Sequence, residues 1–387
     1  MDNMKRKLRE DFSRTFGSKD NTRVFFAPGR VNLIGEHTDY VGGHVFPCAL
    51  NFGTYGIVRK RSDRTVRMFS ANMDEKGIIE FSLDEVIFDE SHDWVNYPKG
   101  VIKEFLSLGH PLSGMDIYVY GDIPNGAGLS SSASLELLMG VIIESLFEID
   151  IDRIELCKMS QRAENNFVGV NCGIMDQFAI GMGKTDCAIL LDCDTLNYEY
   201  VPLVLKGLSI IITNTNKRRG LADSKYNERR EETDKALAIL QRKFDIASLG
   251  ELSLVDFESS KDLFVDDVIY KRSRHSVSEN ERTLKAVESL MKGDLKLFGS
   301  YMNASHASLR DDYEVTCKEL DTLVMLAEPF SVGVRMTGAG FGGCIVALVE
   351  DSKVEEFKKV VGLEYEKAIG YKPTFYVASI GDGAREI

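Results

Sequence analysis

Hydrophobic positions along the chain recur with two spacings, one typical of helices and one typical of strands. Met4, Leu8, Phe12 and Phe16 repeat every four residues in a charged stretch and predict an amphipathic helix over 3–17. Comparable spacing predicts helices over 94–108, 134–147, 151–167, 222–243, 280–293, 297–309, 314–327 and 352–367. The chain is therefore expected to be rich in helices that each bury one face.

Short apolar or alternating runs predict the strands. Val24 to Ala27 is such a run, and Pro28-Gly29 is expected to end it. Further strands are expected at 44–60, 65–70, 78–81, 115–120, 187–191, 208–213, 332–336, 344–349 and 374–379. Helices and strands mix without regular alternation, which favours an α+β fold over a doubly wound parallel sheet. A length of 387 residues predicts two domains, which we place at 1–200 and 201–387.

Charge and cysteine content narrow the class of protein. The net charge of −13 argues against general binding to nucleic acid or anionic membrane, which needs a basic face. Seven cysteines without a Cys-x-x-Cys pair indicate reduced thiols rather than a disulfide framework or a thiolate zinc site. The charged N-terminal segment carries no secretory pattern, and no apolar run approaches the ~20 residues that span a bilayer. We expect a cytoplasmic protein.

A polar segment follows directly after the first predicted strand. Residues 28–40 are dense in polar side chains, among them those of Arg30, Asn32, Glu36, His37, Thr38 and Asp39. Such groups are costly to bury without partners, and a ligand with many hydroxyls would satisfy them. The alternative interpretation is a polar surface loop. A metal site is not supported, because no second histidine lies three or four residues from His37.

A small-residue segment runs into the helix predicted over 134–147. It reads Pro124, Asn125, Gly126, Ala127, Gly128, Leu129, Ser130, Ser131, Ser132, Ala133 and Ser134. Small residues let a ligand approach the backbone, and the start of a helix offers free N–H groups and a positive dipole end. The segment therefore predicts a phosphate site, although it lacks the Gly-Lys-Ser/Thr of a Walker loop. The alternative is a serine-rich helix cap.

A glycine-rich segment lies between the predicted strands 332–336 and 344–349. Gly338, Gly340 and Gly343 formally match the dinucleotide-binding fingerprint. That fingerprint needs a helix after the glycines, whereas here a strand follows. We interpret the segment as a turn that brings two backbone segments close to a ligand, with a simple hairpin as the alternative.

Two acidic residues stand out between these segments. Asp176 follows Gly173 and lies among Ile174, Met175 and Phe178, where a carboxylate needs a partner or a ligand. Glu164 precedes it by twelve residues. One acid could bind a metal while the other acts as a base, although each could equally be a structural carboxylate.

The three segments resemble those of the galactokinases, which belong to the GHMP small-molecule kinase superfamily. Residues 29–40 look like the sugar signature of that family, and segments 124–134 and 337–343 match patterns shared more widely. The resemblance covers essentially the whole chain. It implies a two-domain fold with mixed sheets and helices and an active site in the cleft between the domains. It also implies transfer of the ATP γ-phosphoryl group to the C1 hydroxyl of α-D-galactose. The products would be galactose 1-phosphate and ADP, in the first committed step of galactose catabolism.

The resemblance also implies a role for each site residue. Asp176 would act on the C1 hydroxyl as a base, and Arg30 would stabilise charge; because an arginine partner weakens a carboxylate as a base, Asp176 could instead orient the hydroxyl. The sugar would contact Glu36, His37, Thr38, Asp39, Gly173 and Tyr226. Segment 124–134 would wrap the phosphates, with Trp94 and Tyr97 by the adenine. Ser132 and Glu164 would be near Mg²⁺, with Ser131 as an alternative to Ser132.

Other functions remain open from the sequence. A galactose- and ATP-binding sensor without catalysis would need changes in the serine-rich segment, which is intact here. A kinase for N-acetylgalactosamine or another sugar would differ in residues that the sequence does not identify. A dehydrogenase would rest on the match at Gly338 alone. The expected partners are small molecules only, and we expect a monomer.

Overall fold

The first half of the molecule is built on a six-stranded sheet. A computed structural model describes residues 2–123, 128–217 and 222–387. The strand order is β13-β1-β3-β6-β4-β5. These strands are β1 (Arg23–Asn32), β3 (Pro47–Lys60), β4 (Thr65–Ser70), β5 (Ile79–Ser82), β6 (Met115–Gly121) and β13 (Arg385–Glu386). The pairs are antiparallel except β4 with β6, so the sheet is mixed.

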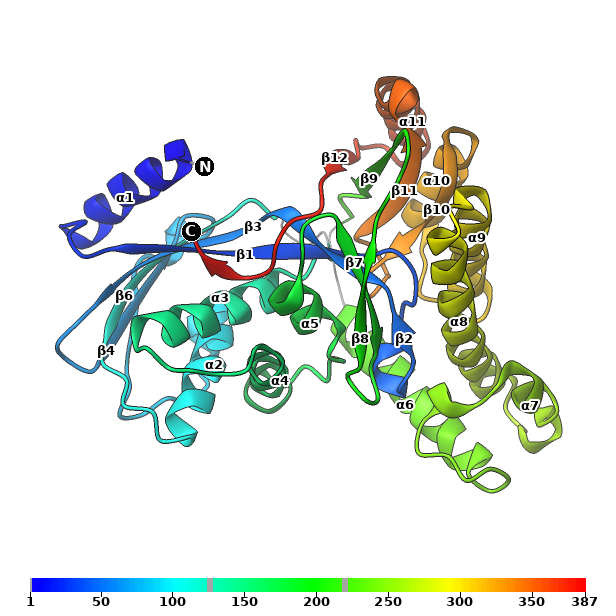
Figure 1. Cartoon of the computed structure of the whole chain (residues 1–387), viewed down its shortest axis with the longest axis horizontal. Helices are drawn as coiled ribbons and strands as arrows, with labels where there is room; N and C mark the ends of the chain where they lie inside the picture. The colour runs from blue at the N-terminus through cyan, green and yellow to red at the C-terminus, as the bar shows by residue number, and fades with distance from the viewer. Residues whose placement is uncertain (1, 124–127, 218–221) are drawn as a thin grey trace.

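Helices cover both faces of this sheet (Figure 1). On one face, α1 (Asp2–Phe16) buries Leu8 and Phe12 against Ile57 and Tyr118. The other face is covered by α2 (Asn96–Ser107), α3 (Ser131–Leu146), α4 (Arg153–Arg162) and α5 (Met175–Met182). A π-helical segment, Ala163–Val168, follows α4 directly. The larger core therefore lies under α3, which is apolar on nearly all sides.

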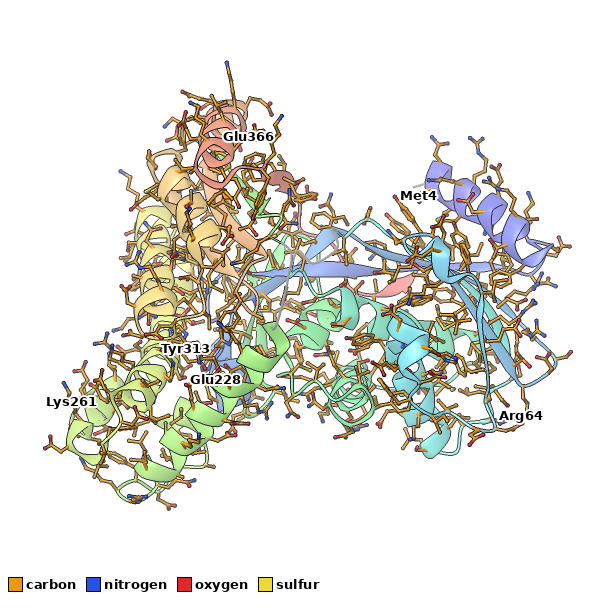
Figure 2. All side chains as sticks on the ribbon, turned by 180° about the vertical axis from the view of Figure 1, so that it is seen from behind. Met4, Arg64, Glu228, Lys261, Tyr313 and Glu366 are labelled. Carbon is orange, nitrogen blue, oxygen red and sulfur yellow. The ribbon has the colours of Figure 1, made fainter. Side chains whose placement is uncertain are left out.

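The second half packs helices against a four-stranded sheet of order β10-β11-β9-β12. Its strands are β9 (Leu208–Asn214), β10 (Ser331–Thr337), β11 (Cys344–Glu350) and β12 (Thr374–Ala378). The helices are α6 (Ala222–Leu240), α7 (Leu254–Glu258), α8 (Asp267–Met291), α9 (Leu295–Asp311), α10 (Lys318–Ala327) and α11 (Val354–Ile369). In Figure 2, Glu366 and Lys261 mark the two ends of this half, and Met4 and Arg64 mark the opposite half.

A small sheet and a shared core join the two halves. The sheet has the order β2-β7-β8, with β2 (His44–Val45), β7 (Cys187–Asp192) and β8 (Tyr198–Pro202). The shared core packs Val31 and Phe46 from the first half against Phe298 and Val346 from the second. The polar segment after β1 therefore runs directly into the junction between the halves.

Most predicted elements lie where the sequence placed them, and the α+β class is confirmed. The helix predicted over 280–293 begins earlier, at Asp267, and the predicted end of the first strand is wrong: β1 continues through Pro28-Gly29 to Asn32. The pairing of β1 with β3 shifts register between Pro28 and Arg30, and such an irregularity accommodates a proline that cannot donate a hydrogen bond. The continuation has a consequence for the site, because it extends the strand as far as Arg30.

Two further findings bear on domain organisation. The chain end returns to the first half, where β13 pairs with β1. The boundary near residue 200 stays a prediction. All seven cysteines lie in the described part of the chain, and none of them forms a disulfide. Within the described residues, no helix combines the length and apolar character needed to cross a membrane.

Candidate active site

An arginine–aspartate pair lies between β1 and α5. Arg30 Nε donates to Asp176 Oδ1 at 2.7 Å, and Arg30 Nη2 donates to Asp176 Oδ2 at 3.0 Å. Ser130 Oγ also donates to Asp176, and Arg30 Nη1 donates to the Gly128 carbonyl oxygen at 2.7 Å. The Arg30 side chain is 4% exposed and that of Asp176 is 28% exposed. The structure thus brings the two predicted catalytic residues together and leaves the carboxylate accessible.

The segment before α3 reaches this pair. Ser130 has a left-handed backbone conformation with φ of 61°, and α3 begins at Ser131. Ser131 is exposed and Ser132 is half-buried. The predicted phosphate-binding residues Pro124, Asn125, Gly126 and Ala127 lie outside the described residues. The remaining segment presents the start of a long helix beside Asp176, which suits an anion.

Three residues predicted to bind ATP have buried side chains instead. Leu129 packs in the core shared by the two halves, and Ala133 is fully buried. Ser134 Oγ lies 2.9 Å from the Ala27 carbonyl oxygen and 2.8 Å from Thr54 Oγ1. Their side chains therefore hold α3 on the sheet, and their contact with a nucleotide stays a prediction.

The glycine-rich turn between β10 and β11 meets the same segment. A Cβ atom on Gly338 would lie 2.8 Å from the Gly128 carbonyl oxygen, and Gly338 has φ of 87°. Both facts require glycine at this position. The strand β11 follows the turn, so the exclusion of a dinucleotide-binding fold is confirmed.

Glu36 and Thr38 from the sugar-signature segment are deeply buried. The Glu36 carboxylate accepts hydrogen bonds from Asn32, from Arg335 Nη1 at 3.1 Å, from Thr337 Oγ1 at 3.0 Å and from the Gly338 backbone. Thr38 Oγ1 lies 2.9 Å from the Gly35 carbonyl oxygen and 2.7 Å from that of His44. Both side chains stabilise the local backbone, and their contact with a sugar stays a prediction.

His37 is held in a group of tyrosine rings. Its Nδ1 lies 2.8 Å from Tyr40 Oη and its Nε2 lies 3.2 Å from the Ala339 carbonyl oxygen. The rings of Tyr226 and Tyr313 have centroids 5.6 Å and 4.9 Å from that of His37. Burial and the nearby His275 lower the pKa of His37 to about 3, so the imidazole is neutral. A neutral ring with Nε2 donating to Ala339 accepts a hydrogen bond from Tyr40 at Nδ1.

Asp39 and Gly173 are in direct contact. A Cβ atom on Gly173 would lie 2.0 Å from Asp39 Oδ2, so any larger residue there would displace the Asp39 carboxylate. The Met175 backbone N–H donates to Asp39 Oδ2 at 3.4 Å. Burial, and then the negative charge of Asp176, raise the pKa of Asp39 to about 6. The site therefore holds two carboxylates of which one is easily protonated.

A second acidic group lies behind Asp176. Gln177 Nε2 donates to Glu164 Oε2 at 2.7 Å and to Glu136 Oε2 at 3.0 Å. Burial and the charge of Asp176 raise the pKa of Glu164 to about 7, against a hydrogen bond from Ser132 that lowers it. Burial, followed by the charge of Glu164, raises the pKa of Glu136 well above its usual value. The predicted metal ligands Ser132 and Glu164 are thus in contact.

Trp94 and Tyr97 lie on the α2 side of the same core. Trp94 is 9% exposed and Tyr97 is partly buried against the core residues. The Trp94 Nε1 atom has no hydrogen-bond partner among the described residues. The α2 helix packs against the 163–168 segment that carries Glu164. Their predicted position beside an adenine is compatible with this location and stays a prediction.

A cavity of about 460 Å³ opens beside the sugar-signature segment. Asp39 and Gly173 form one wall, and Arg230 and Leu237 of α6 form another. Figure 2 shows Tyr313 labelled beside Glu228 of α6, and the neighbouring Arg229 Nε donates to the Tyr313 carbonyl oxygen at 2.8 Å. The cavity lies between the two halves but does not include Arg30 or Asp176, so we place the chemistry at the ion pair and not in the cavity.

Comparisons with known proteins agree with this geometry. Residues 10–60 match the galactokinase galactose-binding signature, residues 96–184 the GHMP kinases N terminal domain, and residues 286–367 the GHMP kinases C terminal family. The chain is 57% identical over 383 residues to a galactokinase of Clostridium beijerinckii, covering 98% of each chain. The chain belongs to the galactokinases.

Further relatives support the assignment. A galactokinase of Bacillus subtilis is 53% identical over 387 residues, with 99% of both chains covered. The crystal structure of Lactococcus lactis galactokinase complexed with galactose has a TM-score of 0.97 at 49% identity, covering 99% of this chain and 100% of that one. A mevalonate kinase of Methanococcus jannaschii, at 18% identity and a TM-score of 0.68, shares the fold. The predicted GHMP-kinase-like fold is thereby confirmed.

Several residues at this galactokinase site were missed in the sequence. Glu136 and Gln177 contact Glu164, and Tyr40 and Tyr313 surround His37. Glu136 lies one helical turn after Ser132. An acidic residue near the start of a largely apolar helix was the sequence signal that could have identified it. Tyr40 ends the sugar-signature segment without having been assigned a role, and Tyr313 gave no signal, because the two meet only in the fold.

Proposed function

We propose that this chain transfers the γ-phosphoryl group of ATP to the C1 hydroxyl of α-D-galactose, giving galactose 1-phosphate and ADP. The observation that carries the proposal is the bidentate Arg30–Asp176 pair at the start of α3, next to the sugar-signature segment. Phosphoryl transfer needs mainly positioning and charge stabilisation, and this pair offers both to an acceptor hydroxyl.

Asp176 would accept a hydrogen bond from the C1 hydroxyl and aim its oxygen at the phosphate. Its side chain is partly exposed and is fixed from two sides by Arg30 and Ser130. Arg30 would stabilise the charge that develops on the transferred group, while its contact with Gly128 keeps it beside the phosphate segment. The start of α3 would meet the other phosphate oxygens, since its N–H groups point outward there. Trp94 and Tyr97 would lie beside the adenine.

Mg²⁺ fits the residues that the structure brings together. The kinase family uses a nucleotide, usually with a divalent metal, and Ser132 and Glu164 offer the hard oxygen donors that Mg²⁺ prefers. No group of three or more His, Cys, Asp or Glu residues suited to a metal occurs among residues 2–123, 128–217 and 222–387. Two protein ligands suffice for Mg²⁺ bound with substrate phosphates. When bound, the ion would neutralise phosphate charge, and Gln177 would orient Glu164 toward it.

Glu164→Gln is expected to raise the Mg²⁺ concentration for half-maximal activity by ~10-fold or more, because a lost carboxylate ligand or its support typically costs that much. Calorimetric titration of Mg²⁺ with a non-hydrolysable ATP analogue should show the same loss without turnover. Glu155→Gln is the matched control, since Glu155 is partly exposed and pairs with Arg162 instead. Unchanged Mg²⁺ dependence in Glu164→Gln would remove Glu164 from the metal site.

Galactose affinity is expected to rise as the pH increases from 5 to 7. Burial raises the pKa of Asp39 to about 6, and a carboxylate accepts hydrogen bonds from sugar hydroxyls more strongly than a carboxylic acid does. Calorimetry without ATP and Mg²⁺ isolates this effect from Glu164. Flat affinity over this range would exclude Asp39 as an ionised sugar ligand.

The same group gives a second, opposite readout. A carboxyl whose pKa is raised in the folded protein favours folding when it is protonated, so its contribution to stability falls as pH rises from about 4 to 6. Asp39→Asn should therefore raise the melting temperature at pH 8 while it weakens galactose binding. A variant whose fold is merely damaged would show a lower melting temperature together with weaker galactose binding.

The proposed activity is tested by ADP release from the purified protein across a panel of sugars. Galactose should be turned over most efficiently, and N-acetylgalactosamine poorly or not at all. A folded protein that binds galactose and ATP without ADP release would instead be a sensor. We also propose that the protein is a monomer, which the molecular mass of the purified protein in solution tests. Fractionation of cells tests the proposal that it is cytoplasmic.

A further inference from the structure

A fully buried arginine from the second half holds the sugar-signature segment. Arg335 on β10 has no exposed side-chain surface. Its Nη1 donates to Glu36 Oε2 at 3.1 Å and to the Asn32 carbonyl oxygen at 3.1 Å. Its Nε donates to Ser305 Oγ on α9 at 3.1 Å. These contacts fix Nε and Nη1 of the buried guanidinium, whereas Nη2 has no hydrogen-bond partner among the described residues.

Glu279 on α8 forms the other end of the network. Its carboxylate is fully buried, accepts a hydrogen bond from the Gly35 backbone N–H at 3.0 Å and lies 3.7 Å from Arg335 Nη2. Arg282 pairs with the second oxygen of the same carboxylate. Burial alone would raise the pKa of Glu279, but Arg282, His275 and Arg335 lower it to about 2. Glu279 is therefore a charged anchor within the protein interior.

These contacts converge on a stretch of unusual backbone. His37 has φ of 61°, a left-handed conformation that is uncommon for residues other than glycine. The preceding Glu36 is fixed through its side chain by Arg335 and through its carbonyl oxygen by His275 Nε2 at 3.1 Å. A segment with this conformation persists when the surrounding structure determines it. The determining groups here come from α8 and β10, far from residue 37 in sequence.

We propose that Arg335 and Glu279 are positioning residues that set the affinity for the sugar by fixing the backbone and side chains of residues 35–39, without contacting the sugar. The inference rests on the proposed role of these residues in binding galactose. The second half of the molecule would then contribute to sugar recognition, in addition to the contact that its glycine-rich turn makes with the segment before α3.

The test compares two arginine-to-lysine substitutions, one inside this network and one outside it. Arg335→Lys keeps the positive charge but loses the planar guanidinium, whose N–H groups bond to Glu36, Asn32 and Ser305 at the same time. We expect the KM for galactose to rise by ~10-fold or more, the scale of a lost charge-assisted hydrogen bond, with the KM for ATP nearly unchanged. Arg310→Lys on α9 is the matched control: Arg310 is exposed, pairs with Asp311 and has no contact with residues 35–39 among those described, so both KM values should stay unchanged.

Galactose binding by calorimetry without nucleotide should show the same contrast between the two variants. Should Arg335→Lys fail to fold, Ser305→Ala removes the hydroxyl shared by Arg335 and Glu279 and should give the same selective rise in galactose KM. A wild-type galactose KM, or equal rises in both KM values, would overturn the proposal. Wild-type turnover of galactose is measured alongside, so failure of the proposed function would be recognised separately.

Discussion

Asp176→Ala is expected to lower kcat by at least ~10²-fold, the usual scale for a positioned acid–base group. Asp176 is the one partly exposed carboxylate that Arg30 and Ser130 hold from two sides, and it lies at the start of α3 where the phosphates would bind. Removing it would leave the acceptor hydroxyl without an oriented partner. The measurement is kcat at saturating galactose and ATP, with thermal unfolding to confirm the fold.

Asp176→Asn separates the two roles that the sequence left open. The amide keeps the shape and can still accept a hydrogen bond from the C1 hydroxyl, but it cannot take the proton. If orientation is the main role, Asn should retain far more activity than Ala; if proton acceptance is essential, the two variants should be equally impaired. Near wild-type kcat in Asp176→Ala would remove this residue from the mechanism.

Arg30→Ala is expected to lower kcat/KM by ~10²–10³-fold, the loss typical of removing one donor that stabilises a developing charge. The side chain is 4% exposed and makes three hydrogen bonds, two to Asp176 and one to the Gly128 carbonyl oxygen. The variant therefore loses charge stabilisation and also leaves Asp176 free to rotate. Unchanged kcat/KM in a folded protein would contradict the role of Arg30.

Two comparisons sharpen this prediction. Arg30→Lys keeps a positive charge but not the bidentate geometry, so it should recover only part of the loss. Because Arg30 and Asp176 act as a unit, the double variant Arg30→Ala with Asp176→Ala should lose little more than the more impaired single variant. Additive losses would indicate that the two residues act independently.

The elements of the fold were largely predictable because most of them show clear hydrophobic periodicity. The exception is α8, which begins at Asp267 and not near residue 280. Its first turns bury polar side chains, including those of Arg272, Ser273 and His275, so the apolar pattern is hidden. Arg272 and His275 bond to partners on α6, α9 and the sugar-signature segment, which no local pattern reveals.

The site was predictable in its segments but not in its connections. The density of polar residues at 30–39 and of small residues before α3 identified both segments, and the resemblance suggested the pairing of Arg30 with Asp176. The link between Glu36 and Arg335 joins residues 299 positions apart and left no trace in either segment. His275, Glu279 and Arg282 lie on one face of a helix, and that spacing of polar residues was the missed signal.

The net charge of −13 also acquires a more specific meaning. At long range it should repel ATP, yet the site provides the start of α3, Arg30 and the two oxygen-bearing side chains that we propose for Mg²⁺. Local groups of this kind act over a few ångströms, whereas the overall charge is screened by salt beyond about 10 Å. The overall charge therefore argues against binding to nucleic acid or anionic membrane, and it says little about the proposed phosphate site.

The most direct test of the central claim is phosphorus NMR of the product formed from ATP and galactose by the purified protein. We expect one new phosphomonoester that shows coupling to the anomeric proton of α-D-galactose, formed in step with ADP and abolished in Asp176→Ala. A phosphate on another hydroxyl, or ATP hydrolysis to free phosphate without a sugar phosphate, would contradict the account.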